Sequence, residues 1–123
     1  KVLEREYLTA GRMSDIGLTV DFIKDHYSVD LPNGRTITIG RCDMTNGYEL
    51  KAPNESASPK NVIENSIENS MSKEGITRLI VDITDNHQVS YDEVIKAGID
   101  YCKEHSIKFT VSVLSGKRLR NVN

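Results

Sequence analysis

The stretch "TRLIVDIT", residues 77–84, is a short aliphatic run typical of a buried strand. A helix is expected before it, in "SASPKNVIENSIENSM" (56–71), where Ser58 can cap the helix and Pro59 suits the first helical position. A second helix is expected after it, because "SYDE" (90–93) has the pattern of a capping box. The stretch is therefore predicted to be a strand that the chain enters and leaves through helices.

Further strands are expected on both sides of this unit. "IKFTVSVL" (107–114) alternates apolar and polar residues, as a half-buried strand does. "SVDLPNGRTITIG" (28–40) combines a Pro-Asn-Gly turn with alternating Thr and Ile, and "TNG" (45–47) then turns the chain into a strand that carries Glu49 and Lys51. The two strands on either side of this second turn are expected to form a hairpin.

The N-terminal part adds a helix in "VLEREYLTAGRMSDIG" (2–17) and a short strand in "LTVDFI" (18–23). The chain order mixes a hairpin with strands that are connected by helices, which indicates an α+β fold with helices packed against a mixed sheet. A length of 123 residues with 37% apolar residues fits one domain over 1–123.

The overall charge and hydrophobicity limit the possible partners. No apolar run is long enough to span a membrane, so no membrane partner is expected for this domain. The net charge is −2, so a nucleic acid would need a local basic patch. The segment "SGKRLRN" (115–121) offers such a patch through Lys117, Arg118 and Arg120, or it is simply a solvated end.

Glu49 and Lys51 form the most suggestive pair of the sequence. Side chains of a strand alternate between its faces, so these two are expected on one face and Tyr48 and Leu50 on the other. That arrangement fits a solvated sheet surface. It also fits the floor of a nuclease site, which must hold a phosphate and move a proton.

The polar loop "NESASPKN" (54–61) follows this strand and leads into a helix N-terminus, where free backbone amides attract phosphate. The loop residues expected to contact a phosphodiester are Ser56, Ser58, Lys60 and Asn61. Asp82 stands inside the aliphatic run, and a carboxylate there must be paired, exposed at one face or functional, because burying it alone is costly. The charge run of Glu4, Arg5 and Glu6 is expected on a solvated helix face.

Four motifs together resemble a known group of bacterial toxins. They are "LEREYLTAGRMSDIG" (3–17), "CDMTNGYELKAP" (42–53), "SASPKNVIENSI" (56–67) and "RLIVDIT" (78–84). In this order they resemble the C-terminal toxin domains of contact-dependent inhibition systems. The resemblance is closest to the ribonuclease group with the barnase/EndoU/colicin/RelE fold, in which helices pack on a mostly antiparallel or mixed sheet.

The resemblance implies a small ribonuclease that needs neither a metal nor a cofactor and commonly cleaves tRNA. It also implies a tightly bound immunity protein, and delivery from a larger secreted or cell-surface protein into the cytoplasm of a target cell. The matching positions are Glu4, Asp43, Glu49, Lys51, Lys60, Asn61 and Asp82. Glu49, Lys51, Asp82 and Asp43 are the expected catalytic residues, although Cys42 stands where the family often has Pro before the Asp.

Two alternatives stay open. The letters Asp43, Glu49-x-Lys51 also spell the motif of restriction-endonuclease-like nucleases, in which carboxylates bind a divalent cation and the lysine orients the attacking water. The core of that family is a helix, a strand meander, a helix and a strand, and the short spacing from Asp43 to Glu49 leaves little room for the meander. The other alternative is a binding domain without enzymatic activity, for which the pair is a solvated strand face.

Overall fold

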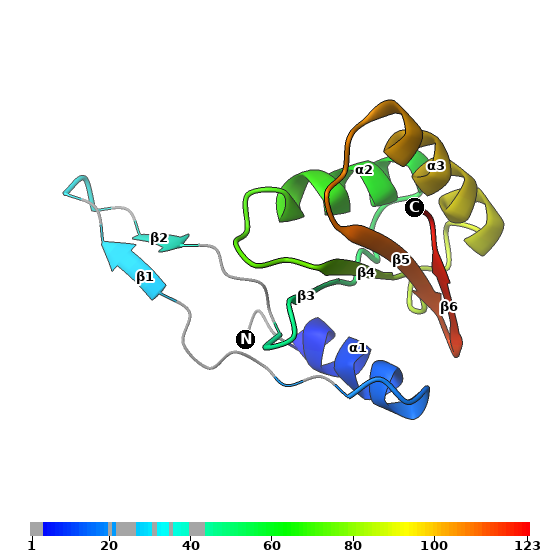
Figure 1. Ribbon diagram of the computed structural model, residues 1–123, viewed down its shortest axis with the longest axis horizontal. Helices are drawn as coiled ribbons and strands as arrows, with labels where there is room; N and C mark the ends of the chain where they lie inside the picture. The colour runs from blue at the N-terminus through cyan, green and yellow to red at the C-terminus, as the bar shows by residue number, and fades with distance from the viewer. Residues whose placement is uncertain (1–3, 20, 22–26, 31, 35, 40–43) are drawn as a thin grey trace.

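The computed structural model describes residues 4–19, 21, 27–30, 32–34, 36–39 and 44–123 (Figure 1). The helices are α1 (Glu4–Asp15), α2 (Pro59–Ser70) and α3 (Tyr91–Glu104). The strands are β1 (Tyr27–Asp30), β2 (Thr36–Ile39), β3 (Tyr48–Lys51), β4 (Arg78–Asp82), β5 (Thr110–Ser115) and β6 (Arg118–Asn121). None of the helices in these described ranges is both long and apolar enough to cross a membrane.

The main sheet has four strands in the order β3-β4-β5-β6, and β1 pairs with β2 in a separate two-stranded sheet. β4 runs parallel to both β3 and β5, and β6 is antiparallel to β5. The expected α+β class with a mixed sheet is thus confirmed. Parallel strand pairs outnumber antiparallel ones in the main sheet. The reason is that α2 and α3 each return the chain to the end of the sheet at which the preceding strand began.

The prediction of a hairpin between β2 and β3 is wrong. β2 pairs with β1 in antiparallel register instead, across the turn that contains Gly34, whose φ is 82°. The nearer turn determines the partner, because a short loop joins two adjacent strands most directly. The strand expected over 18–23 lies partly outside the described residues, and Leu18, Thr19 and Asp21 are not in a strand.

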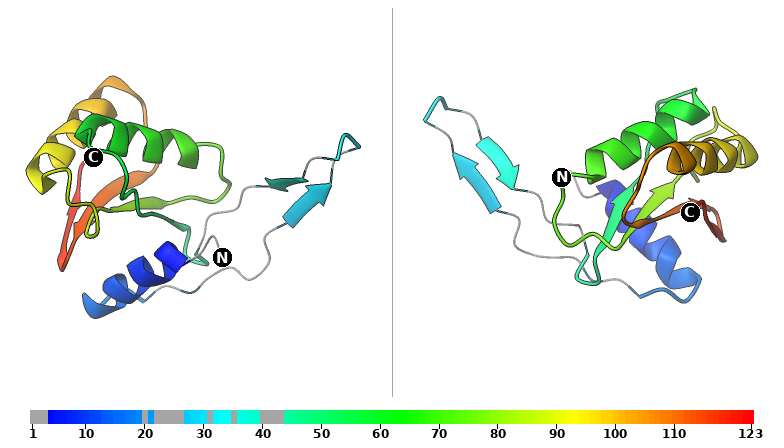
Figure 2. Two further views of the ribbon diagram at one scale, coloured as in Figure 1. Left: turned by 180° about the vertical axis from the view of Figure 1, so that it is seen from behind. Right: turned by 45° about the horizontal axis from the view of Figure 1, so that its top comes forward.

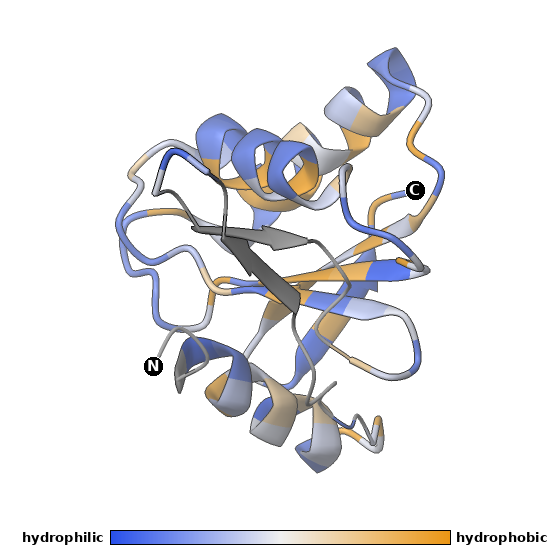
Figure 3. Ribbon diagram, turned by 90° about the vertical axis from the view of Figure 1, so that its left-hand side faces the viewer, coloured by the Kyte–Doolittle hydropathy of each residue, from blue (hydrophilic) through white to orange (hydrophobic). Residues whose placement is uncertain are grey.

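The helices cover both faces of the main sheet (Figures 1 and 2). α2 and α3 pack on one face, where Ile63, Leu79, Val94 and Val111 are among the residues of the larger core. α1 lies along the other face, where Met13 joins a smaller core. Figure 3 shows hydrophobic segments of α2 and α3 turned toward the sheet and hydrophilic ones turned outward, as in amphipathic helices.

The local signals in the sequence explain where the helices on the larger core begin. The Ser58 hydroxyl caps α2 by accepting a hydrogen bond from the Asn61 amide at 3.2 Å, and Pro59 is the first helical residue. The Ser90 hydroxyl caps α3 in the same way, accepting from the Glu93 amide at 3.1 Å. Both starts were predicted, because capping depends on residues within one turn.

The C-terminal segment is an edge strand rather than a loose tail. β6 pairs with β5 from Arg118 to Asn121, so it occupies the edge of the sheet opposite β3. The chain end is fixed as well, since the Asn123 side chain accepts from the Val111 amide and donates to the Phe109 carbonyl, at 2.7 and 2.9 Å. Two strands, β4 and β5, therefore separate the basic residues Lys117, Arg118 and Arg120 from β3, which carries Glu49.

Candidate functional site

A polar cavity of about 560 Å³ opens where the start of α1, the end of β3 and one side of α2 meet. Its volume is within the range of small-molecule and nucleotide sites. The residues that line it are Arg5, Glu6, Lys51, Ala52, Pro53, Ser56, Asn61, Val62, Asn65, Ser66 and Asn69. Three of the predicted site residues, Lys51, Ser56 and Asn61, thus come together in one cavity.

Glu49 and Lys51 lie on one face of β3, as their spacing predicts, and form an ion pair with Nζ 3.4 Å from Oε2. The expectation of a solvated face is wrong for Glu49, whose side chain is 0% exposed. Glu49 is opposite Leu79 of β4 in the register, on the face that α2 covers. Lys73 also binds the same carboxylate oxygen, so Glu49 is a buried acid that two lysines neutralise.

Lys51 is the member of this pair that reaches the cavity. Its side chain is 28% exposed and lines the cavity, while its ammonium group also forms the ion pair with the buried Glu49. An ammonium group that binds one carboxylate oxygen has donors left for a second anion. The arrangement can therefore present a positive charge to a phosphate that enters the cavity.

The N-terminal helix contributes Arg5 and Glu6 to the cavity wall, which the sequence interpretation missed. One carboxylate oxygen of Glu6, Oε2, is buried without a hydrogen-bond partner among the described residues. A buried carboxylate oxygen is costly to leave unpaired, so this atom points to a ligand that completes it. The charge run at residues 4–6 was the available signal, but only the packing of α1 against β3 brings it to Lys51.

The loop before α2 is divided between two places. Ser56 lines the cavity, and its hydroxyl accepts from the Ser58 amide at 3.2 Å. Ser58 serves as the helix cap, which occupies the amide of Asn61. Lys60 points away, toward Glu64 with a separation of 3.7 Å, and lines a smaller cavity between α2 and α3. Ser58 and Lys60 are not among the residues that line the main cavity.

Asn86 holds this loop in place from the end of β4. Its side-chain amide donates to the carbonyl oxygens of Pro53 and Ser56, at 3.1 and 3.0 Å, and the residue is 5% exposed. Its own carbonyl oxygen accepts from the Gln88 amide at 2.9 Å. The wall of the cavity that contains Pro53 and Ser56 is therefore tied to the sheet.

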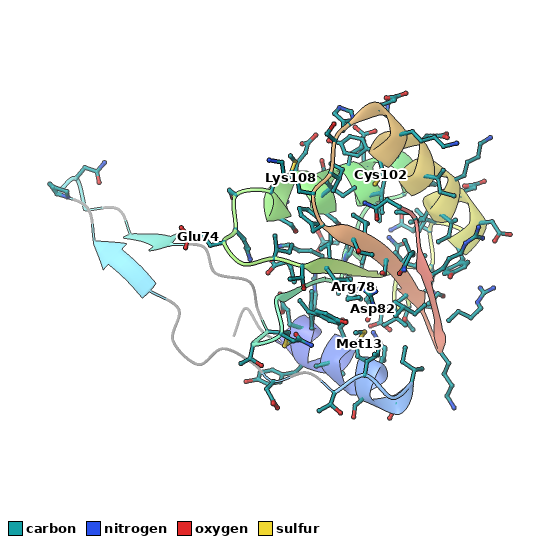
Figure 4. All side chains as sticks on the ribbon, viewed as in Figure 1. Met13, Glu74, Arg78, Asp82, Cys102 and Lys108 are labelled. Atoms are coloured by element: carbon teal, nitrogen blue, oxygen red, sulfur yellow. The ribbon has the colours of Figure 1, made fainter. Side chains whose placement is uncertain are left out.

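Asp82 lies on the opposite face of the sheet from Glu49, together with α1 (Figure 4). Its Oδ2 accepts from the Thr9 hydroxyl at 2.7 Å and from the Arg12 guanidinium at 2.6 Å. Its Oδ1 accepts from the Thr84 amide at 3.0 Å. These contacts satisfy a carboxylate that is 2% exposed and attach α1 to β4.

Arg12 remains cationic in this network. Burial alone lowers its pKa, but its hydrogen bonds to Asp85 and Asp82 raise the pKa above the ordinary value. The guanidinium therefore compensates the buried charge of Asp82.

The remaining predicted residues do not reach the cavity or lie outside the described part of the chain. Asp43 is outside the described residues. Arg118 stacks over the ring of Tyr91 with 4.2 Å from its central carbon to the ring centroid, on the edge of the sheet opposite β3. Lys117 and Arg120 are on the same edge and are exposed.

Other titratable groups with shifted properties are on α3, away from the cavity. Burial raises the pKa of the Cys102 thiol, which is free. Burial also raises the pKa of the Tyr101 hydroxyl, and the nearby carboxylate of Glu68 adds to the effect. These pKa shifts are explained by the packing of α3 against the rest of the protein. No residue of α3 is among those that line the main cavity.

Neither a protein-family model nor a curated relative matches the sequence. Among solved structures, the chain is similar to one described as "CdiA-CT/CdiI toxin and immunity complex from Burkholderia pseudomallei". The TM-score is 0.55 at 20% identity, and the match covers 97% of this chain and 82% of that chain. At this identity the likeness shows a shared fold, and it extends over nearly the whole chain.

Proposed function

We propose that this chain is the toxic nuclease domain of a contact-dependent inhibition protein and that it cleaves RNA, with tRNA as the expected class. The proposal is supported by the likeness in fold to a toxin of such a system and by the polar cavity beside Lys51. A larger secreted or cell-surface protein would deliver the domain into the cytoplasm of a target cell.

Lys51 is the observation that carries the proposal. Its ammonium is fixed by the buried Glu49 and opens into a cavity that also contains Arg5. A phosphodiester gains negative charge during cleavage, and a fixed donor such as Lys51 stabilises this charge without reorganisation. Arg5 adds a second cationic group, which is 3.7 Å from the exposed carboxylate of Glu55. A cavity of about 560 Å³ has room for a nucleotide at this point.

In a cleavage that needs no metal, the ribose 2′-hydroxyl attacks the adjacent phosphorus while a nearby base takes its proton. The P–O5′ bond then breaks, which leaves a 2′,3′-cyclic phosphate and a 5′-hydroxyl that has taken up a proton. Glu49 has no exposed surface, so it acts by orienting Lys51 rather than by touching the hydroxyl. Glu6 lines the cavity with an oxygen that lacks a partner among the described residues, and we assign it the role of proton acceptor. Lys51 then stabilises the charge on the phosphate.

The chain topology favours a second candidate, the metal-dependent mechanism of restriction-endonuclease-like nucleases. β3 and β4 run parallel and are connected by α2, and Glu49-x-Lys51 lies on the first of these strands. The order of the elements along the chain is that of the family's core, but β1 and β2 form a separate sheet and so do not complete a strand meander with β3.

The cavity can be tested for its fit to a divalent cation. Hard cations prefer carboxylate oxygens, and the oxygen of Glu6 without a partner is such a donor beside Lys51. Within the described ranges no group of three or more His, Cys, Asp or Glu residues is placed to hold a metal, and Asp43 is outside those ranges. Glu6 is the only carboxylate among the residues that line the cavity, and Glu49 is buried and bound by two lysines, so the described residues do not fit a divalent cation.

Cleavage of purified total RNA, with either EDTA or added Mg²⁺, distinguishes these mechanisms. If the site works through the 2′-hydroxyl alone, we expect the same cleavage rate in both conditions. If cleavage follows the metal-dependent mechanism, EDTA should abolish it and Mg²⁺ should restore it. RNA that stays intact in both conditions would contradict the nuclease proposal and leave a binding domain as the better interpretation.

The partner implied by the toxin proposal gives a test in cells. Expression of the domain in a bacterial cytoplasm should stop growth, and co-expression of the protein encoded next to it should restore growth. An acidic surface on that immunity protein would suit the cationic groups around the cavity and speed the association. Normal growth of cells that accumulate the intact domain alone would count against a toxin.

A further inference from the structure

Three asparagines form one wall of the cavity. Asn61, Asn65 and Asn69 are spaced by four residues along α2, which places them on one side of the helix. All three line the cavity and are exposed. The wall extends for about 12 Å, since eight residues of helix rise by that amount.

The side-chain amides of this wall have no hydrogen-bond partner within the described part of the chain. The only hydrogen bond of Asn61 to another described residue outside the helix uses its backbone amide, at the Ser58 cap. Ser66, which lines the cavity between them, already donates its hydroxyl to the Val62 carbonyl at 2.7 Å. The wall therefore presents free amides and no competing hydroxyl donor.

The chemistry of this wall differs from that of the cationic residues in the same cavity. Lys51 and Arg5 offer positive charge that suits phosphate, and contacts to phosphate carry no information about the base. An asparagine amide has a donor and an acceptor side by side, the arrangement that matches the N6 and N7 atoms of adenine. A single strand exposes these base edges, whereas a duplex hides part of them.

We propose that Asn65 and Asn69 bind the bases of single-stranded RNA and give the domain a preference for adenine near the cleaved bond. The inference rests on the proposed function in taking RNA as the ligand, and it adds base recognition to the same cavity. Lys51 and Arg5 hold the backbone, while the amides on α2 select the base.

The test measures binding without cleavage. Fluorescence anisotropy with 2′-O-methyl oligonucleotides of A, C or U, in EDTA, gives three affinities that differ only by the base. We expect the A oligonucleotide to bind about tenfold more tightly than the other two, as one or two amide contacts would produce. In the Asn65→Ala/Asn69→Ala variant the three affinities should become equal within about twofold, because the recognition energy is lost.

Glu68→Ala is the matched control, because Glu68 is an exposed residue of α2 that does not line the cavity. Loss of its negative charge can strengthen binding of all three oligonucleotides, but their ratio should stay as in the wild type. Alanine is a better helix former than asparagine, so the double variant should melt no lower than the wild type. Circular dichroism checks this.

Equal binding of the three oligonucleotides by the wild type, an unchanged ratio in the double variant, or no binding at all would each overturn the inference. A failure of the nuclease proposal would give a result different from these three outcomes. If total RNA stays intact with Mg²⁺ and with EDTA while the base preference depends on the asparagines, the nuclease proposal fails and base recognition stands.

Discussion

Lys51→Ala is expected to lower the rate of RNA cleavage by about 100- to 1,000-fold, the usual effect of removing one preorganised donor from a developing negative charge. Lys51 is the cationic end of the buried pair that opens into the cavity. Its removal leaves Glu49 paired with Lys73, so the fold should survive. The initial rate of cleavage of a labelled RNA at saturating concentration measures the effect.

Lys103→Ala is a suitable control, because Lys103 is an exposed lysine of α3 that does not line the cavity. It removes the same charge and should leave the rate at saturating RNA near that of the wild type. Glu49 is a less informative target, since its loss would leave two lysines around an empty buried position. A fully active Lys51→Ala variant would place the active site elsewhere.

Asp82→Ala is expected to lower the free energy of unfolding by about 1–3 kcal/mol, the typical cost of leaving a buried polar group without its hydrogen-bond partner. The change leaves Arg12, whose side chain is 22% exposed, without its closer carboxylate, and it leaves the buried Thr9 hydroxyl without its acceptor. Urea unfolding followed by circular dichroism measures the difference.

Asp85→Ala is the matched change for this prediction. Asp85 binds the same guanidinium at 2.9 Å, but its side chain is 52% exposed, so its loss should cost about 0.5 kcal/mol or less. If Asp82→Ala keeps the stability of the wild type and loses cleavage, Asp82 takes part in the chemistry and does not mainly anchor α1.

Many elements of the fold could be predicted because their signals are local. Ser58 and Pro59 start α2, and Ser90 starts α3, within one helical turn of each signal. The alternation of residues 107–114 correctly predicted β5, although the strand begins at Thr110. The two-residue period also placed Glu49 and Lys51 on one face, where they form an ion pair.

The pairing of strands and the burial of charges were not predictable in the same way. The pairing of β2 with β1 rather than with β3 could not be predicted from the turns, because both turns contain Asn-Gly. Lys73, the second cation on Glu49, comes 24 positions later in the chain, after α2 has crossed over the sheet. A strand pattern alone predicts alternation, but it does not identify the element that covers each face.

The sequence by itself determined the three helices, the buried strand β4 and the shared face of Glu49 and Lys51, because periodicity and capping act over a few neighbouring residues. Only the tertiary structure decided that Glu6 and Asn65 join Lys51 in one cavity and that Asp82 lies behind the sheet. These placements arise from contacts between distant segments. The Thr9 and Asp82 hydrogen bond, for example, joins residues that are 73 positions apart. Such contacts form only when helices pack on a completed sheet, since each needs the other surface to bury its apolar face.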